Sequence, residues 1–142
     1  MKLNLTNLDQ LDFSKGDGLL PVIAQHARSG KVLMQGFANQ EALQKSLETG
    51  DLTFFSRSKN RLWTKGESSG HTLKLQSMAA DCDQDSILAL VLPIGPTCHV
   101  GTESCWHESE ANQPDLAFLD QLEQVIHSRY GADPSSSYTA SL

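Results

Sequence analysis

Four short apolar runs, separated by polar turns, constrain the fold of this chain more than any other feature of its sequence. They are LTFFSRS at 52–58, RLWTK at 61–65, HTLKLQSMAA at 71–80 and SILALVLPI at 86–94. Runs of this length that are rich in β-branched and aromatic residues and end at turn residues are typical of strands. We predict that these four segments form one curved antiparallel or mixed sheet.

The segment before them predicts a hairpin followed by a helix. The apolar runs at 19–25 and 31–37 are separated by Arg-Ser-Gly-Lys, which is a turn-like sequence. Asn39 is a good N-cap for the helix, and Gly50 suits the position just after its last turn. Residues 1–18 predict a short entry segment with one or two helical turns.

The C-terminal part predicts a loop and a second helix. Residues 94–108 are rich in Gly, Pro and Cys and indicate a loop, and residues 109–113 form a polar linker. Residues 114–129 have the apolar spacing of an amphipathic helix. The predicted class is therefore α+β: a small curved β-sheet domain at 1–108 with one or two flanking helices, plus an appended C-terminal amphipathic helix.

Charge and composition exclude several classes of protein. The net charge of −6 argues against a general nucleic-acid binder, which needs a basic surface. No stretch approaches the roughly 18 apolar residues of a membrane span, and the N-terminus has no signal-peptide pattern. We expect a soluble cytoplasmic protein without a membrane or nucleic-acid partner. Arg57, Lys59, Arg61 and Lys65 nevertheless form a local basic cluster, which suits a phosphorylated small molecule.

The run Asp81-Cys82-Asp83-Gln84-Asp85 is the densest candidate site. In a strand, the three carboxylates would line one face and Cys82 the other. A hard cation such as magnesium would relieve the repulsion between the carboxylates. The alternative is a solvated acidic turn. An EF-hand fits poorly, because Ser86 and Leu92 stand at the positions of its glycine and final glutamate.

The cysteines form the second candidate site. Cys82, Cys98 and Cys105 are separated by 15 and then 6 residues, which is not the paired spacing of a closed structural zinc site. Three thiolates can still hold zinc and leave a fourth position for water. The alternative is that three free cysteines simply pack. His99 is a candidate acid, base or fourth ligand.

The segment 56–71 is the third candidate site. It combines cations for phosphates, an aromatic ring for a base and small turn residues whose backbone can approach a ligand. The alternative is a solvated hairpin with Trp63 in the core. The candidate substrate-binding residues are Arg57, Arg61, Trp63, Lys65, Glu67, Ser68 and Gly70.

Taken together, the motifs SRSxxRLWxKGExSG, DCDxD and GPTCHxGxxSCW resemble the phosphoribosyl-AMP cyclohydrolase family over residues 15–106. Family members often have Phe where Trp106 stands. The resemblance implies zinc held by Cys82, Cys98 and Cys105, magnesium held by Asp81, Asp83 and Asp85, and catalysis by His99. It also implies a homodimer whose zinc site is built across the subunit interface, with Cys82 facing the cysteines of the partner.

The resemblance implies hydrolysis of the N1–C6 bond of 1-(5-phosphoribosyl)-AMP by a zinc-bound hydroxide, the third step of histidine biosynthesis. Two alternatives remain open. One is another zinc-dependent purine nucleotide hydrolase such as a deaminase, although the usual deaminase cysteine spacing is missing. The other is a non-catalytic dimer that zinc merely staples together.

A second resemblance covers the tail. Residues 119–129 and 132–142 are similar to the opening of phosphoribosyl-ATP pyrophosphohydrolase, a domain that follows the cyclohydrolase in some bifunctional proteins. We expect 114–142 to be the truncated start of that domain, without its activity. Release of pyrophosphate from phosphoribosyl-ATP would contradict this expectation.

Overall fold

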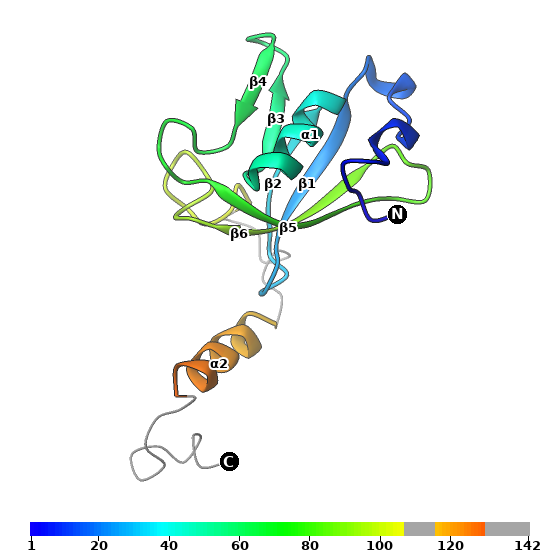
Figure 1. The fold of residues 1–142 in the computed structure, drawn as a ribbon. Coiled ribbons are helices and arrows are strands. Elements are labelled where there is room, and N and C mark those ends of the chain that lie inside the picture. Colours follow the sequence, from blue (N-terminus) through cyan, green and yellow to red (C-terminus); the bar gives the residue numbers. More distant parts are fainter. Residues whose placement is uncertain (107–115, 130–142) are drawn as a thin grey trace.

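A computed structural model describes residues 1–106 and 116–129 of the chain (Figure 1). The N-terminal segment makes two short 3-10 turns, η1 (Leu8–Gln10) and η2 (Ser14–Gly16). The elements that follow are β1 (Leu20–His26), β2 (Val32–Ala38), α1 (Gln40–Thr49), β3 (Thr53–Ser56), β4 (Arg61–Thr64), β5 (Leu73–Ala80), β6 (Ile87–Pro93) and α2 (Leu116–Ser128).

The strands form two sheets. Four of them make a mixed sheet in the order β2-β1-β6-β5, in which β1 and β6 are parallel and the other pairs are antiparallel. The hairpin β3–β4 forms a separate two-stranded sheet and stands beside α1 (Figure 1). The prediction of one sheet was therefore wrong. The two strands of this hairpin pair with each other along their whole length, and the adjoining Leu52 N–H donates instead to the Leu73 carbonyl at the start of β5.

The α+β class, the first hairpin and the helix at 40–49 are confirmed. Asn39 caps α1, since its side chain accepts a hydrogen bond from the Ala42 N–H at 2.8 Å. Gly50 ends the helix with a φ of 79°, a conformation that glycine adopts readily. The predicted helical turns at the N-terminus are also present as η1 and η2.

The core lies between the four-stranded sheet, α1 and the β3–β4 hairpin. Alternate residues of β1 and β6 are buried on one face of the sheet, as a half-buried strand requires. Phe54 of β3 is almost fully buried and packs over Gly36 of β2, where an added Cβ would lie 2.6 Å from the Phe54 ring. The glycine in β2 therefore makes room for the phenylalanine that joins the two sheets.

Among the described residues, the sheet and α2 each expose apolar side chains. Ile23 and Leu88 lie on the outer face of the sheet. Leu119, Leu122, Val125 and Ile126 are exposed on α2, which lies within the range predicted for an amphipathic helix. The predicted linker at 109–113 and the tail after 129 lie outside the described residues. No helix in the described ranges is long and apolar enough to cross a membrane.

Candidate metal and substrate site

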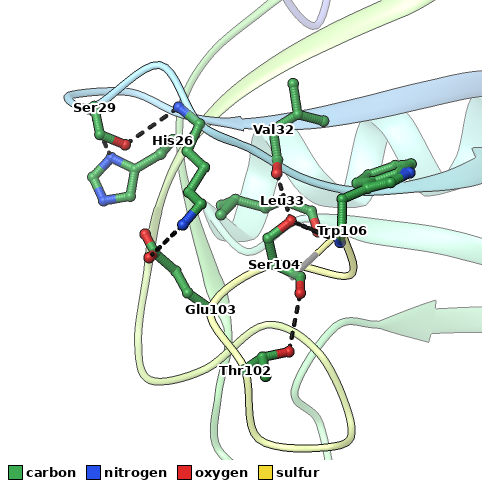
Figure 2. Close-up of polar contacts among 9 residues, drawn as sticks. His26, Ser29, Val32, Leu33, Thr102, Glu103, Ser104 and Trp106 are labelled. Carbon is green, nitrogen blue, oxygen red and sulfur yellow. Dashed lines mark hydrogen bonds and ion pairs between the residues drawn. The ribbon is translucent and has the colours of Figure 1, made fainter. Parts of the chain in front are cut away.

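The loop that carries Cys98 and Cys105 is fastened to the first hairpin through Ser104 (Figure 2). The Ser104 side chain is buried, donates to the Val32 carbonyl at 2.7 Å and accepts from the Trp106 N–H at 3.0 Å. The Cys105 N–H adds a backbone hydrogen bond to the Leu33 carbonyl at 2.9 Å. The sheet edge at β2 therefore fixes where Cys105 lies.

The same loop folds back on itself and brings two of the three cysteines together. The Cys98 N–H donates to the Thr102 carbonyl at 3.0 Å, and the thiols of Cys98 and Cys105 lie close enough to shift each other's pKa. The backbone N–H of Val100 lowers the pKa of Cys98, because it stabilises the thiolate. Burial raises the pKa of Cys105, and the neighbouring Cys98 adds to this effect. Cys98 is the thiol better prepared to act as a metal ligand, since metals bind the thiolate.

Cys82 lies elsewhere. It is exposed in the turn between β5 and β6, and within residues 1–106 and 116–129 no three side chains of metal-ligating type gather at one place. The chain by itself therefore brings together two of the three cysteines predicted to bind zinc.

The aspartate run forms the turn between β5 and β6. Residues 81–86 lie between the two strands, so the prediction that the carboxylates share a strand face was wrong. One Asp81 oxygen accepts from the backbone N–H groups of Asp85 at 3.0 Å and Ser86 at 3.3 Å, and the bond from Asp85 is the main reason that the pKa of Asp81 is lowered. Asp85 itself pairs with Lys15 at 2.8 Å. Asp83 is exposed. The acidic turn of the alternative interpretation is thus present, and the magnesium site stays a prediction.

Two of the predicted substrate cations have partners within the chain. Arg61 pairs with Glu67 at 2.5 Å, and this ion pair lowers the pKa of Glu67. Glu67 also accepts from the Thr64 N–H at 3.3 Å, so it closes the turn after β4. Arg57 lies over the ring of Phe37 at 4.2 Å.

Trp63 lies at the edge of the core rather than in the open. The centres of the Trp63 and Phe54 rings lie 5.7 Å apart. The Lys65 ammonium lies 5.6 Å from the centre of the Trp63 ring. The ring therefore supports the position of Lys65. Ser68 and Gly70 are exposed in the loop between β4 and β5.

A pocket of about 290 Å³ lies where that loop meets the Cys98 loop. Its lining residues are Lys65, Ser69, His71, Pro96, Thr97, Cys98, His99 and Gly101. Three of them, Lys65, Cys98 and His99, were candidates from the sequence. A larger hollow of about 550 Å³ beside α1 contains none of the candidate residues. The smaller pocket is the better site, because an ammonium, two hydroxyls, two imidazoles and a thiol converge there.

Sequence reasoning assigned no role to Ser69, His71 or Thr97. All three stand inside the motifs that carry the family resemblance, but only the fold shows that they face one pocket. Gly95 is the signal that could have indicated the close approach of the two loops, because an added Cβ there would lie 2.7 Å from the His71 ring.

The Thr97 hydroxyl makes no hydrogen bond to any described residue, although the side chain is only 1% exposed. We expect Thr97→Val to leave the free energy of unfolding of the ligand-free protein unchanged or to raise it by about 1 kcal/mol. The reason is that a buried hydroxyl without a partner carries a desolvation penalty of about 1–3 kcal/mol. Chemical denaturation measures this effect.

Thr53→Val is the matched control. The Thr53 hydroxyl donates to the Asp51 carbonyl at 3.0 Å and lies 3.0 Å from the Thr64 hydroxyl, so its loss costs about 1–2 kcal/mol. An equal loss of stability in Thr97→Val would contradict the prediction.

Removing the Ser104 hydroxyl should loosen the Cys98–Cys105 loop. We expect Ser104→Ala to cost about 1–3 kcal/mol, because the Trp106 N–H loses its acceptor and the Val32 carbonyl loses this donor. Amide exchange at Cys105 should accelerate. Ser128→Ala removes an equally short hydrogen bond on an exposed helix end and should change stability by less than about 0.5 kcal/mol. Unchanged exchange at Cys105 would show that Ser104 does not hold the loop.

Comparison with known proteins agrees with this site. The family model described as phosphoribosyl-AMP cyclohydrolase matches residues 34–107, which include the pocket and all three cysteines. The histidine biosynthesis bifunctional protein HisIE of Vibrio cholerae is 57% identical over 137 residues, 96% of this chain and 65% of that protein. The HisIE protein of Escherichia coli K12 is 59% identical over 133 residues, 94% of this chain and 64% of that protein. The chain thus spans a little under two thirds of the length of these two relatives, and it belongs to the phosphoribosyl-AMP cyclohydrolase family.

Proposed function

We propose that this chain hydrolyses 1-(5-phosphoribosyl)-AMP and opens its purine ring between N1 and C6, as a step of histidine biosynthesis. The observation that supports this most is the single pocket between the two family motifs, which places Lys65 on one wall and Cys98 with His99 on the other. A phosphorylated nucleotide needs a cation at one end and proton-transferring groups at its reacting end, and this pocket offers both.

The donor set fits zinc. Cys98 and Cys105 are adjacent, and the pKa of Cys98 is lowered by the Val100 N–H, so a soft divalent metal would meet a thiolate there. Cys82 is the third ligand of the proposal and comes from the partner of a homodimer. Its exposure and its separation from the other two cysteines support this arrangement. Bound zinc supplies Lewis acidity that makes water nucleophilic at neutral pH.

The acidic turn fits a hard cation in its chemistry. Asp81 has a lowered pKa and is ionised at neutral pH, and Asp85 already attracts the Lys15 ammonium. We propose that Asp81, Asp83 and Asp85 hold magnesium. The metal would take the place of Lys15 beside Asp85, so magnesium should bind more tightly when Lys15 is replaced by Met.

The chain's own residues have the following roles in the proposed reaction. Lys65 binds a phosphoryl group, and its ammonium is kept beside Trp63. His99, which is exposed at the pocket, accepts a proton from the attacking water and returns it to N1 as the N1–C6 bond breaks. The water oxygen ends on C6, so the product is an opened ring with a carboxamide. Glu67 and Arg61 shape the loop through their ion pair rather than by contact with the substrate.

The test is an absorbance assay of phosphoribosyl-AMP turnover by metal-stripped protein, before and after zinc and magnesium are restored. Ring opening that depends on zinc and releases no ammonia is the expected result. Ammonia release would indicate a deaminase instead. A folded, zinc-loaded dimer without turnover would indicate that zinc only staples the subunits together.

A further inference from the structure

His71 lines the pocket, yet the proposed reaction gives it no role. The residue follows the loop between β4 and β5, and its side chain is half-buried. Lys65 and Ser69, from the same loop, line the pocket with it. Cys98 and His99 come from the other loop. The pocket therefore has one wall that offers an ammonium, a hydroxyl and an imidazole.

The His71 ring packs directly against Gly95. A Cβ added at Gly95 would lie 2.7 Å from the His71 Cδ2 atom, 3.0 Å from Cγ and 3.1 Å from Nε2. Every other residue type carries a Cβ, so only glycine lets the ring pack this closely. The two loops are joined beside this contact, where the Ile94 N–H donates to the Thr72 carbonyl at 2.8 Å. The ring is therefore fixed against the loop that leads from β6 to Cys98.

The backbone of His71 is fixed as well. A Cβ added at Gly66 would lie 2.3 Å from the His71 carbonyl carbon and 2.4 Å from its oxygen. The His71 N–H donates to the Ser69 hydroxyl at 3.2 Å. Both ends of the loop thus meet at this residue, which gives the side chain a defined position.

The ring itself makes no hydrogen bond or ion pair with the described residues. His26 shows the contrast, because its Nδ1 accepts from the backbone N–H group of Ser29 at 3.2 Å (Figure 2). It also accepts from the Arg28 N–H at 3.1 Å and so closes the first hairpin. A buried or half-buried histidine with a structural role usually has such partners. The His71 ring is thus held in place by packing, and neither of its nitrogens has a polar partner among the described residues.

We propose that His71 is a substrate-binding residue: with Lys65 and Ser69 it forms a wall that binds a phosphoryl group of the nucleotide. An ammonium, a hydroxyl and an imidazole N–H are all hydrogen-bond donors to phosphate oxygens. This inference rests on the proposed function and adds to it a residue that holds the substrate rather than one that moves protons.

Steady-state kinetics of the zinc-loaded protein with phosphoribosyl-AMP test the proposal. In His71→Ala the KM should rise about tenfold while kcat stays within about threefold, because a lost hydrogen bond to a charged group weakens ground-state and transition-state binding alike. His71→Gln, which keeps a donor N–H, should recover part of the loss. Zinc content should equal that of the wild type.

Gly95→Ala displaces the ring without changing any polar group. Its control is Gly50→Ala, since Gly50 has nearly the same φ, 79° against 80°, but no atom within 4 Å of an added Cβ. Both variants should lose thermal stability through the strained backbone, Gly95→Ala somewhat more because the His71 ring must move, and only Gly95→Ala should raise the KM. His26→Ala should lower the melting temperature and leave the KM unchanged.

An unchanged KM in both His71→Ala and Gly95→Ala would overturn the proposal. So would a loss confined to kcat, which would place the ring in the chemical step. If the wild-type protein does not turn over phosphoribosyl-AMP, the proposed function fails. If the wild type is active and the His71 variants have the same KM, only the proposed role of His71 fails.

Discussion

Cys82→Ser and Cys98→Ser proteins, each inactive alone, should regain about a quarter of wild-type activity when they are mixed, unfolded and refolded together with zinc. The expectation rests on the proposed homodimer and on the positions of the three cysteines. Cys98 and Cys105 lie on one loop and influence each other's pKa, whereas Cys82 lies in the turn between β5 and β6 and joins no cluster within the described residues. A site shared between two protomers is then rebuilt in one half of each mixed dimer.

The size of the effect follows from the role of each ligand. Each single variant should lose activity by at least about 100-fold, because even residues that only orient metal ligands often have effects of this size. In a mixed dimer, the Cys98→Ser protomer supplies Cys82 and the Cys82→Ser protomer supplies the intact loop. Random pairing makes half of the dimers mixed, and each mixed dimer has one of two sites.

The control is a mixture of Cys98→Ser with Cys105→Ser. Both cysteines lie on one loop, so no pairing of these two proteins contains an intact loop, and activity should not return. The measurements are turnover of phosphoribosyl-AMP and zinc content after refolding. Rescue in this control, or none in the first mixture, would show that the three cysteines are not divided between the protomers in this way.

Gly66→Ala should cost about 2–5 kcal/mol of folding free energy, because it adds a clash with backbone atoms to a left-handed conformation. Gly66 has a φ of 83°, and its added Cβ would lie within 2.3–2.5 Å of backbone atoms of His71 and Thr72. Backbone atoms cannot turn aside as a flexible side chain does. The loop that carries Lys65, Ser69 and His71 must therefore open.

Gly70→Ala separates the clash from the backbone conformation. Gly70 lies in the same loop with a φ of 81°, but nothing lies within 4 Å of its added Cβ, so only the left-handed conformation costs free energy, about 1–2 kcal/mol. Urea denaturation of both variants measures the difference. Equal losses would mean that the loop accommodates the methyl group at Gly66.

The local elements were predictable because their signals are local. Asn39 and Gly50 mark the ends of α1 within the sequence itself, and Arg-Ser-Gly-Lys marks the first turn. The separation of the β3–β4 hairpin from the main sheet was not predictable in this way. It depends on Phe54 packing over Gly36 and on the hydrogen bond from Leu52 to Leu73, and alternation of apolar residues carries no information about either.

The same distinction applies to the site. Residue types identified Cys98, His99 and Lys65 as candidates, and the fold brings them to one pocket. For the acidic run, a strand face and a solvated turn both stayed open, because its alternation suited either. The structure shows that Asp81 uses a carboxylate oxygen to hold the turn. His71 could not be assigned from the sequence, because the proposal for it depends on the packing of its ring against Gly95. The two residues lie 24 positions apart, and only the fold brings them together.

The hydrogen bonds that hold the cysteine loop to β2 also bear on the order in which parts of the chain fold. Ser104 and Val32 are 72 positions apart, and the parallel pairing of β1 with β6 closes across almost the same span. Closure of so long a loop is slow, so α1 and the two local hairpins can form before it. The pair of thiols becomes fixed only when the last strand has joined the sheet. Zinc should therefore bind tightly at these two thiols only after the fold is complete. Metal added early in refolding should meet cysteines that are still far apart.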